Sequence, residues 1–129
     1  MTVAVAITPA GMIDGFYSDE NNVVHGFIRA ADGVLTPFDA PGAGTGAGQG
    51  TFPVGNNPAG AITGYYVDAN GVAHGFLRTP RGEFTFFDAP DASNGPGQGT
   101  FAYEINGAGA ITGFYVDVNS ALHGFLRLP

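Results

Sequence analysis

Short segments rich in apolar residues recur along the chain, and turn residues separate them. Residues 61–67 are rich in β-branched and aromatic side chains and end at Asp68–Gly71, where an Asn-Gly pair favours the positive φ of a tight hairpin turn. Residues 72–78 follow as a second strand, and residues 83–87 as a third. Because no segment of ten or more residues has helical periodicity, the pattern predicts an all-β fold.

The same pattern returns every 49 residues, and the repeat includes the few charged side chains. Thr63–Asp68 returns as Thr112–Asp117, and all three histidines share the spacing. Counting a further short strand around Phe101–Ile105, each full unit is expected to contain four strands, as a propeller blade does. The repeat divides a single domain, residues 1–129, into units at about residues 3–51, 52–100 and 101–129.

The number of units bears on assembly. Propellers close with four to eight blades, and an open set of three blades leaves strand edges that invite pairing with another chain. The sequence therefore predicts a β-propeller closed by homo-oligomerisation, with a dimer of about six blades favoured. The alternative is a monomer in which three units surround a pseudo-threefold axis, as in a β-trefoil or β-prism.

Two segments of the unit also carry a family resemblance. Asn106–Gly113 is a glycine-rich strand entry, and His123–Leu126 is a His-Gly-Phe-Leu strand. The pair resembles the bacterial HAF-type extracellular repeats, and the resemblance extends over every unit. It departs from the usual pattern in the Gly after His and the Arg after Leu. The resemblance implies an extracellular, β-propeller-like array without an established activity.

Composition excludes several classes of partner. The net charge is −7 with four cationic side chains and no Lys, which argues against binding to nucleic-acid phosphates or anionic lipid. The absence of Cys removes disulfides, thiolate nucleophiles and Cys-ligated metals. The apolar run at residues 1–7 is too short for a signal peptide, and no stretch approaches a membrane span. An extracellular location therefore rests on the family resemblance alone.

Polar residues that recur with the period are the candidate site residues. In a structural interpretation, Arg78 pairs with an acid such as Asp88 and His74 bonds to a neighbouring unit, since buried charges need partners. In a binding interpretation, equivalent pockets between units hold carbohydrate through aromatic faces and a few directed hydrogen bonds. The predicted ligand-binding set is Tyr17, Asp19, His25, Arg29, Tyr66, Asp68, Asn70, His74, Arg78, Tyr115, Asp117, Asn119, His123 and Arg127.

Three further patterns in the sequence resemble a metal site, a calcium loop and a phosphate-binding loop. In a compact threefold fold, one histidine from each unit would converge as a three-His metal site. The turn Asp68–Gly71 resembles the start of a calcium loop but lacks the later Glu, which favours an Asx hairpin turn. The glycine-rich residues 42–48 lack the Lys-Ser or Lys-Thr and the helix of a phosphate cradle, so they are expected to form a loop.

Nucleophilic catalysis has no support in the sequence, which contains neither a Gly-x-Ser-x-Gly elbow nor Cys. The residues that break the repeat with a polar group are Asp14, where the other units have Thr, and Glu104, where unit two has Gly55. The sequence predicts no catalytic residues, metal or cofactor. It favours a lectin-like binding or scaffolding module with carbohydrate as the expected ligand, then a structural repeat without ligand, then an enzyme.

Overall fold

The computed structural model describes residues 1–129, which form eleven strands and no helix, so the all-β prediction is confirmed. The structure accordingly has no helix capable of crossing a membrane. Unit one contains β1 (Thr2–Ile7), β2 (Ile13–Ser18), β3 (Val24–Arg29) and β4 (Leu35–Phe38). Unit two contains β5 (Gly50–Asn56), β6 (Ile62–Val67), β7 (Ala73–Arg78) and β8 (Phe84–Phe87). Unit three contains β9 (Gly99–Ile105), β10 (Ile111–Val116) and β11 (Leu122–Arg127).

Each unit is an antiparallel meander, and successive units share hydrogen bonds. The fourth strand of a unit pairs along the outer edge of its third strand, as β4 does with β3 and β8 with β7. The first strand of the next unit joins the same edge through one parallel bridge, Val24 to Gly50 or Ala73 to Gly99. The three units therefore form a single eleven-stranded sheet.

Glycine is required where one unit joins the next. Gly50 has a φ of 128°, and a Cβ atom there would lie 1.9 Å from the carbonyl oxygen of Val24. Gly99 has a φ of 116° and stands equally close, at 2.1 Å, to the carbonyl oxygen of Ala73. No side chain fits that approach, so glycine at these two places sets the path of the chain between units.

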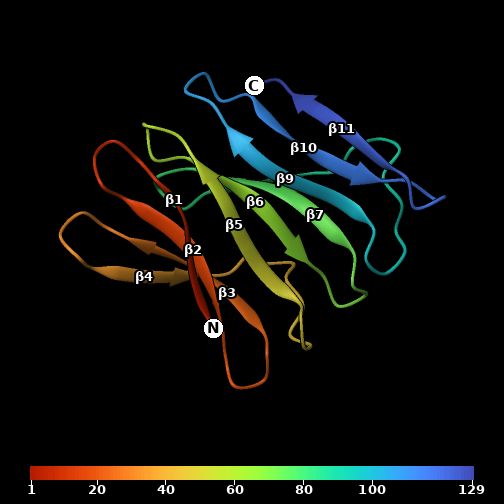
Figure 1. The fold of residues 1–129 in the computed structure, drawn as a ribbon, viewed down its shortest axis with the longest axis horizontal. Helices are drawn as coiled ribbons and strands as arrows, with labels where there is room; N and C mark the ends of the chain where they lie inside the picture. Colours follow the sequence, from red (N-terminus) through yellow and green to blue (C-terminus); the bar gives the residue numbers. More distant parts are fainter.

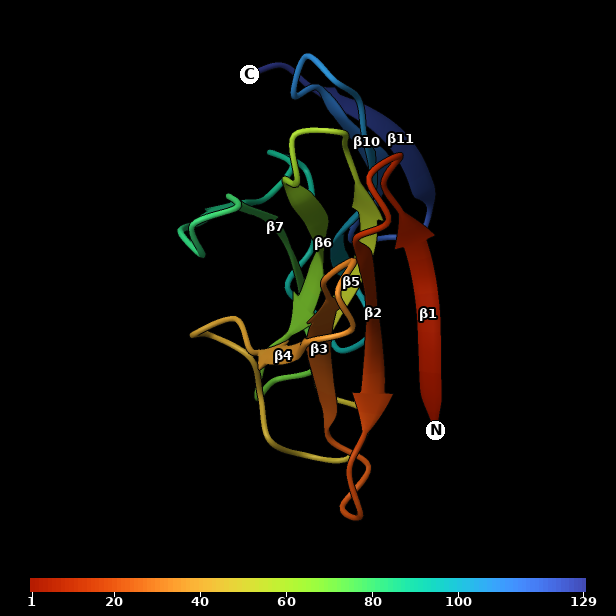
Figure 2. The same cartoon turned by 90° about the vertical axis from the view of Figure 1, so that its left-hand side faces the viewer.

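The sheet curls into a half-barrel, with β1 at one end of the strand order and β11 at the other (Figures 1 and 2). Aromatic rings pack between neighbouring units along the curl. Phe16 of unit one lies 5.4 Å from Phe52 of unit two, and Tyr65 lies 4.9 Å from Phe101 of unit three, measured between ring centres. Closure of this half-barrel into a propeller stays a prediction, as does the threefold alternative.

Equivalent positions differ in burial according to their place in the sheet. Phe76 in the middle unit is fully buried, whereas its counterpart Phe27 in unit one is only half-buried. Thr63 is likewise fully buried, whereas its counterpart Thr112 in unit three is exposed. Only the middle unit has a neighbour on both sides. The outward sides of units one and three therefore leave uncovered the positions that are buried in the middle unit.

Candidate functional site

The hairpin turn between the second and third strands positions an aspartate in every unit. Oδ1 of Asp68 accepts hydrogen bonds from the backbone N–H groups of Asn70 (2.8 Å) and Val72 (3.0 Å). Asp19 and Asp117 make the same pair of bonds in the other units. The Asx-turn prediction is confirmed, and Asn70 and Asn119 lie in these turns as backbone donors.

The other carboxylate oxygen of this aspartate binds the histidine on the next strand. Nε2 of His74 lies 2.8 Å from Oδ2 of Asp68, and its Nδ1 lies 2.9 Å from Oδ1 of Asp88. His25 is held in the same way by Asp19 and Asp39, at 3.0 Å on each side. Because an ionised carboxylate only accepts, both ring nitrogens donate, and this arrangement favours the charged imidazolium.

The third unit has half of this arrangement. Nε2 of His123 lies 2.8 Å from Oδ2 of Asp117, and its Nδ1 has no hydrogen-bond partner in the structure. The imidazole of His123 is also more exposed than those of the other two histidines. His123 therefore has a free nitrogen at the position where units one and two use a second carboxylate.

A tyrosine ring covers each histidine. The ring centres of Tyr66 and His74 lie 5.0 Å apart, and the pairs Tyr17–His25 and Tyr115–His123 are spaced similarly. The structure thus brings together the predicted Tyr, Asp and His of each unit. The resulting His cluster, so named from here on, consists in unit two of Tyr66, Asp68, His74 and Asp88.

Ion pairing moves the pKa values in the directions that the geometry requires. The hydrogen bond to Asp19 raises the pKa of His25, and that of His74 is also raised, because its bonds to two carboxylates outweigh the opposing effect of burial. The bond to His25 lowers the pKa of Asp19. For Asp68, burial raises the pKa, but the bonds from His74 and the turn N–H groups outweigh it and the net direction is down.

The arginines lie away from the His clusters. The guanidinium carbon of Arg78 sits 4.8 Å from the ring centre of Phe38 in unit one, and that of Arg127 sits 4.8 Å from Phe87 in unit two. The predicted pairing of Arg78 with Asp88 is wrong, since Asp88 binds His74 of its own unit. The prediction that His74 bonds to a neighbouring unit is wrong for the same reason. Arginine therefore holds successive units together through cation–π contact.

The histidines do not meet at an axis, because each one is bound by a carboxylate of its own unit. No group of three or more His, Asp and Glu side chains has an arrangement suited to a metal ion. The glycine-rich residues 42–48 lie in the loop between β4 and β5, as predicted.

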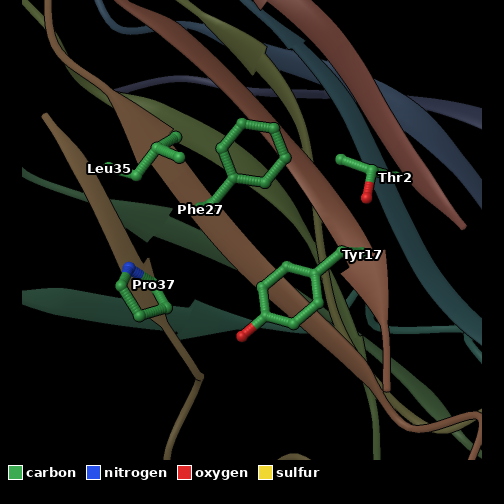
Figure 3. A pocket seen from close by; sticks show the side chains of 5 residues that line it. All are labelled: Thr2, Tyr17, Phe27, Leu35 and Pro37. Atoms are coloured by element: carbon green, nitrogen blue, oxygen red, sulfur yellow. The ribbon is translucent and has the colours of Figure 1, made fainter. Parts of the chain in front are cut away.

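A pocket of about 310 Å³ opens on the outward side of unit one (Figure 3). Four strands contribute its lining, and all the lining side chains except the Thr2 hydroxyl and the Tyr17 phenol are apolar. We call this surface the first-unit face, formed by Thr2, Tyr17, Phe27, Leu35 and Pro37. Sequence reasoning missed every member except Tyr17. The available signal was that these positions repeat as Thr51, Tyr66, Phe76, Phe84 and Phe86.

In unit two, unit one covers Thr51, Tyr66 and Phe84, whereas Phe86 stays 41 % exposed. The hydroxyl of Thr51 accepts the backbone N–H of Ala40 at 2.9 Å, and the Tyr66 ring lies against Gly42. The ring of Phe38 lies 6.2 Å from that of Phe84. The first-unit face is therefore the uncovered form of an interface that the molecule already contains between its units.

The opposite surface belongs to unit three. Leu122 and Leu126 are 65 % and 62 % exposed, whereas their counterparts Ala73 and Leu77 in unit two pack toward unit three. We call this surface the third-unit face, formed by Thr112, Leu122, Gly124 and Leu126. Both faces are apolar, and each corresponds to one side of the contact between successive units.

Asp14, which breaks the repeat, is fully buried between units one and two. Its Oδ1 accepts a hydrogen bond from Nδ2 of Asn56 at 2.6 Å, and its Oδ2 has no partner. Burial raises the pKa of Asp14 to about 6, with a further contribution from the negative charge of Glu104. Because Asp14 is sealed from solvent, it and the exposed Glu104 do not form an accessible acid/base pair.

Comparison with known families, characterised proteins and solved structures finds no match for the chain. The geometry itself separates two candidate sites. In units one and two the histidine nitrogens are used within the His clusters, whereas the first-unit and third-unit faces present groups that are buried elsewhere in the same fold.

Proposed function

We propose that the protein is a non-enzymatic scaffolding module that binds a second copy of itself, with the first-unit face of one copy against the third-unit face of the other. One observation carries the proposal: positions fully or largely buried in the middle unit are half-buried or exposed at these two faces. Phe76 is fully buried where Phe27 is not, and Leu77 packs on unit three where Leu126 is 62 % exposed. Exposed apolar surfaces of this kind are typical of association sites.

The two faces complement each other because they are the two sides of the same internal contact. Inside the molecule, the face around Leu77 receives the next unit, and the face around Phe76 receives the preceding one. A head-to-tail contact between copies would repeat that arrangement. Two half-barrels joined in this way at both ends would form a closed ring of about six units, the number of units expected for a dimer of this repeat. An extracellular setting is part of the proposal through the family resemblance.

Carbohydrate binding at the His clusters is the weaker candidate. A sugar site needs polar groups that are free to bond to hydroxyls, together with an accessible aromatic face. In unit two both nitrogens of His74 and both oxygens of Asp68 already have partners within the unit. Scaffolding requires no rearrangement of these groups.

The test is the mass of the chain in solution with and without a charge on one face. We expect sedimentation equilibrium to give about 26 kDa for the native chain, twice the 13.1 kDa of one copy. Leu126→Glu should shift the mass to that of one copy, because the contact would bury an unpaired carboxylate. The matched control is Ala59→Glu in an exposed turn of unit two, which should leave the larger mass unchanged.

A further inference from the structure

Each contact between successive units includes the same four-residue segment. The segment is Phe-Asp-Ala-Pro, and it occurs at residues 38–41 between units one and two and at residues 87–90 between units two and three. Its first residue ends the fourth strand, and the remaining three lie in the loop that leads to the next unit.

The first half of the segment binds the unit that it belongs to. Phe38 pairs with Gly26 in the sheet, and its ring lies 2.9 Å from the place that a Cβ atom on Gly26 would take. Phe87 covers Gly75 in the same way. The aspartate that follows binds Nδ1 of the histidine, as Asp39 does with His25.

The segment also binds the unit that comes next. The backbone N–H of Ala40 donates to Thr51, and that of Ala89 donates to the hydroxyl of Thr100 at 3.0 Å. The guanidinium of the next unit's arginine lies over the ring of the segment's phenylalanine at 4.8 Å in both cases. The segment therefore needs two neighbouring units to fill all of its contacts.

The matching partner groups are open on the two outward faces. On unit three, Gly124 has only the carbonyl oxygen of Gly113 nearby, at 3.9 Å, the outer edge of β11 pairs with no strand, and Nδ1 of His123 is free. On unit one, the hydroxyl of Thr2 lines the pocket, and Arg29 is exposed with no ring beneath it. These groups are the repeat equivalents of those that the internal segments bind.

We propose that the seam between two copies is a binding seat for a Phe-Asp-Ala-Pro strand of a further protein that carries this segment, because both such segments of each copy are already bound inside it. The segment would add as a strand to the edge of β11, with its phenylalanine over Gly124 and its aspartate on Nδ1 of His123. Its alanine N–H would donate to Thr2 of the other copy, and Arg29 would cover the phenylalanine ring. This inference rests on the proposed function, because the two halves of the seat meet only when the first-unit and third-unit faces come together.

The probe is a synthetic peptide of residues 83–93, Glu-Phe-Thr-Phe-Phe-Asp-Ala-Pro-Asp-Ala-Ser, with blocked ends. Its binding is measured by calorimetry, and the mass of the protein alone is measured separately. Thr2→Val and His123→Gln should each weaken binding about fivefold, the loss expected for one hydrogen bond. Both residues are exposed, so neither change disturbs the core. Ala59→Glu in the protein should leave binding unchanged, and Asp88→Asn within the peptide should weaken it.

The outcomes separate this inference from the proposed function. A mass of about 26 kDa with peptide binding that both substitutions weaken supports both. A mass of about 26 kDa without peptide binding at millimolar concentration overturns the inference and leaves self-association intact. A mass of 13.1 kDa overturns the proposed function. Binding that only one substitution weakens, or neither, overturns the shared seat, because the segment would then not bridge the two faces.

Discussion

At the scale of single residues, the departures from the repeat are more informative than the residues that obey it. Asp14 stands where the other two units have threonine. In unit two the hydroxyl of that threonine, Thr63, donates a hydrogen bond to the carbonyl oxygen of Phe76 at 2.8 Å. A carboxylate at this position has no hydroxyl to donate and is fully buried with one oxygen unpartnered. Unit one therefore carries an energetic penalty at neutral pH that the other two units do not have.

Replacing Asp14 with the repeat residue should stabilise the protein in a pH-dependent way. The pKa of Asp14 is raised from 3.8 to about 6 in the fold, so the native state loses stability as pH rises from about 4 through 6. Asp14→Thr should therefore increase the free energy of unfolding by about 2–3 kcal/mol at pH 7.5 and by much less at pH 4. Urea unfolding at both pH values checks this. Asp91→Thr in an exposed loop is the control, and an equal gain at both pH values would argue against a buried carboxylate as the cause.

His25 and His74 should stabilise the fold with the opposite pH dependence. The pKa of His74 is raised, so its contribution is fully present below pH 6.5 and is lost as pH rises through the folded-state pKa. The lowered pKa of Asp68 keeps that partner ionised at both pH 5 and pH 9. His74→Gln should cost on the order of 1 kcal/mol at pH 5 and less at pH 9. His123→Gln, which removes a bond to one carboxylate instead of two, should cost less at pH 5, and the reverse order would contradict the assignment.

At the scale of elements, the join between units depends on the glycine that begins the first strand of each following unit. Gly99→Ala places a methyl group about 2 Å from the carbonyl oxygen of Ala73 and should cost more than about 3 kcal/mol. Gly97 also has a positive φ, 76°, but nothing lies within 4 Å of its Cβ position, so Gly97→Ala should cost about 1 kcal/mol. Chemical denaturation of the two variants checks the difference, and equal costs would show that the close approach does not matter.

The strands and turns could be predicted from the sequence because their signals are local. The β-branched and aromatic segments, the Asn-Gly pair and the 49-residue spacing place the hairpins, and Asp68 forms the Asx turn expected of it. The site was only partly predictable. His74 and Arg78 share a face of one strand but stand four positions apart, about 13 Å along it. His74 therefore meets Asp88 of its own unit, and Arg78 meets Phe38 of unit one. The alternation of side chains along a strand predicts which side of the sheet a residue faces, but it does not predict which unit packs against that side.

At the scale of the whole molecule, the 49-residue unit supplies the fold and, in our proposal, the association surface. The contact between units one and two contains the rings of Phe38 and Phe84, a hydrogen bond from a backbone N–H to the Thr51 hydroxyl, and an arginine stacked on a phenylalanine. The outward faces present the same groups to solvent. The prediction of a ligand site in each unit stays a prediction, whereas our proposal places binding at the contact between units.

The mass of the native chain in solution decides whether the first-unit and third-unit faces of two copies pair. Sedimentation equilibrium across a range of micromolar concentrations should give about 26 kDa, with Leu126→Glu reduced to a single copy and Ala59→Glu unchanged. A mass of 13.1 kDa at every concentration would contradict the claim that the outward faces reproduce the contact between units.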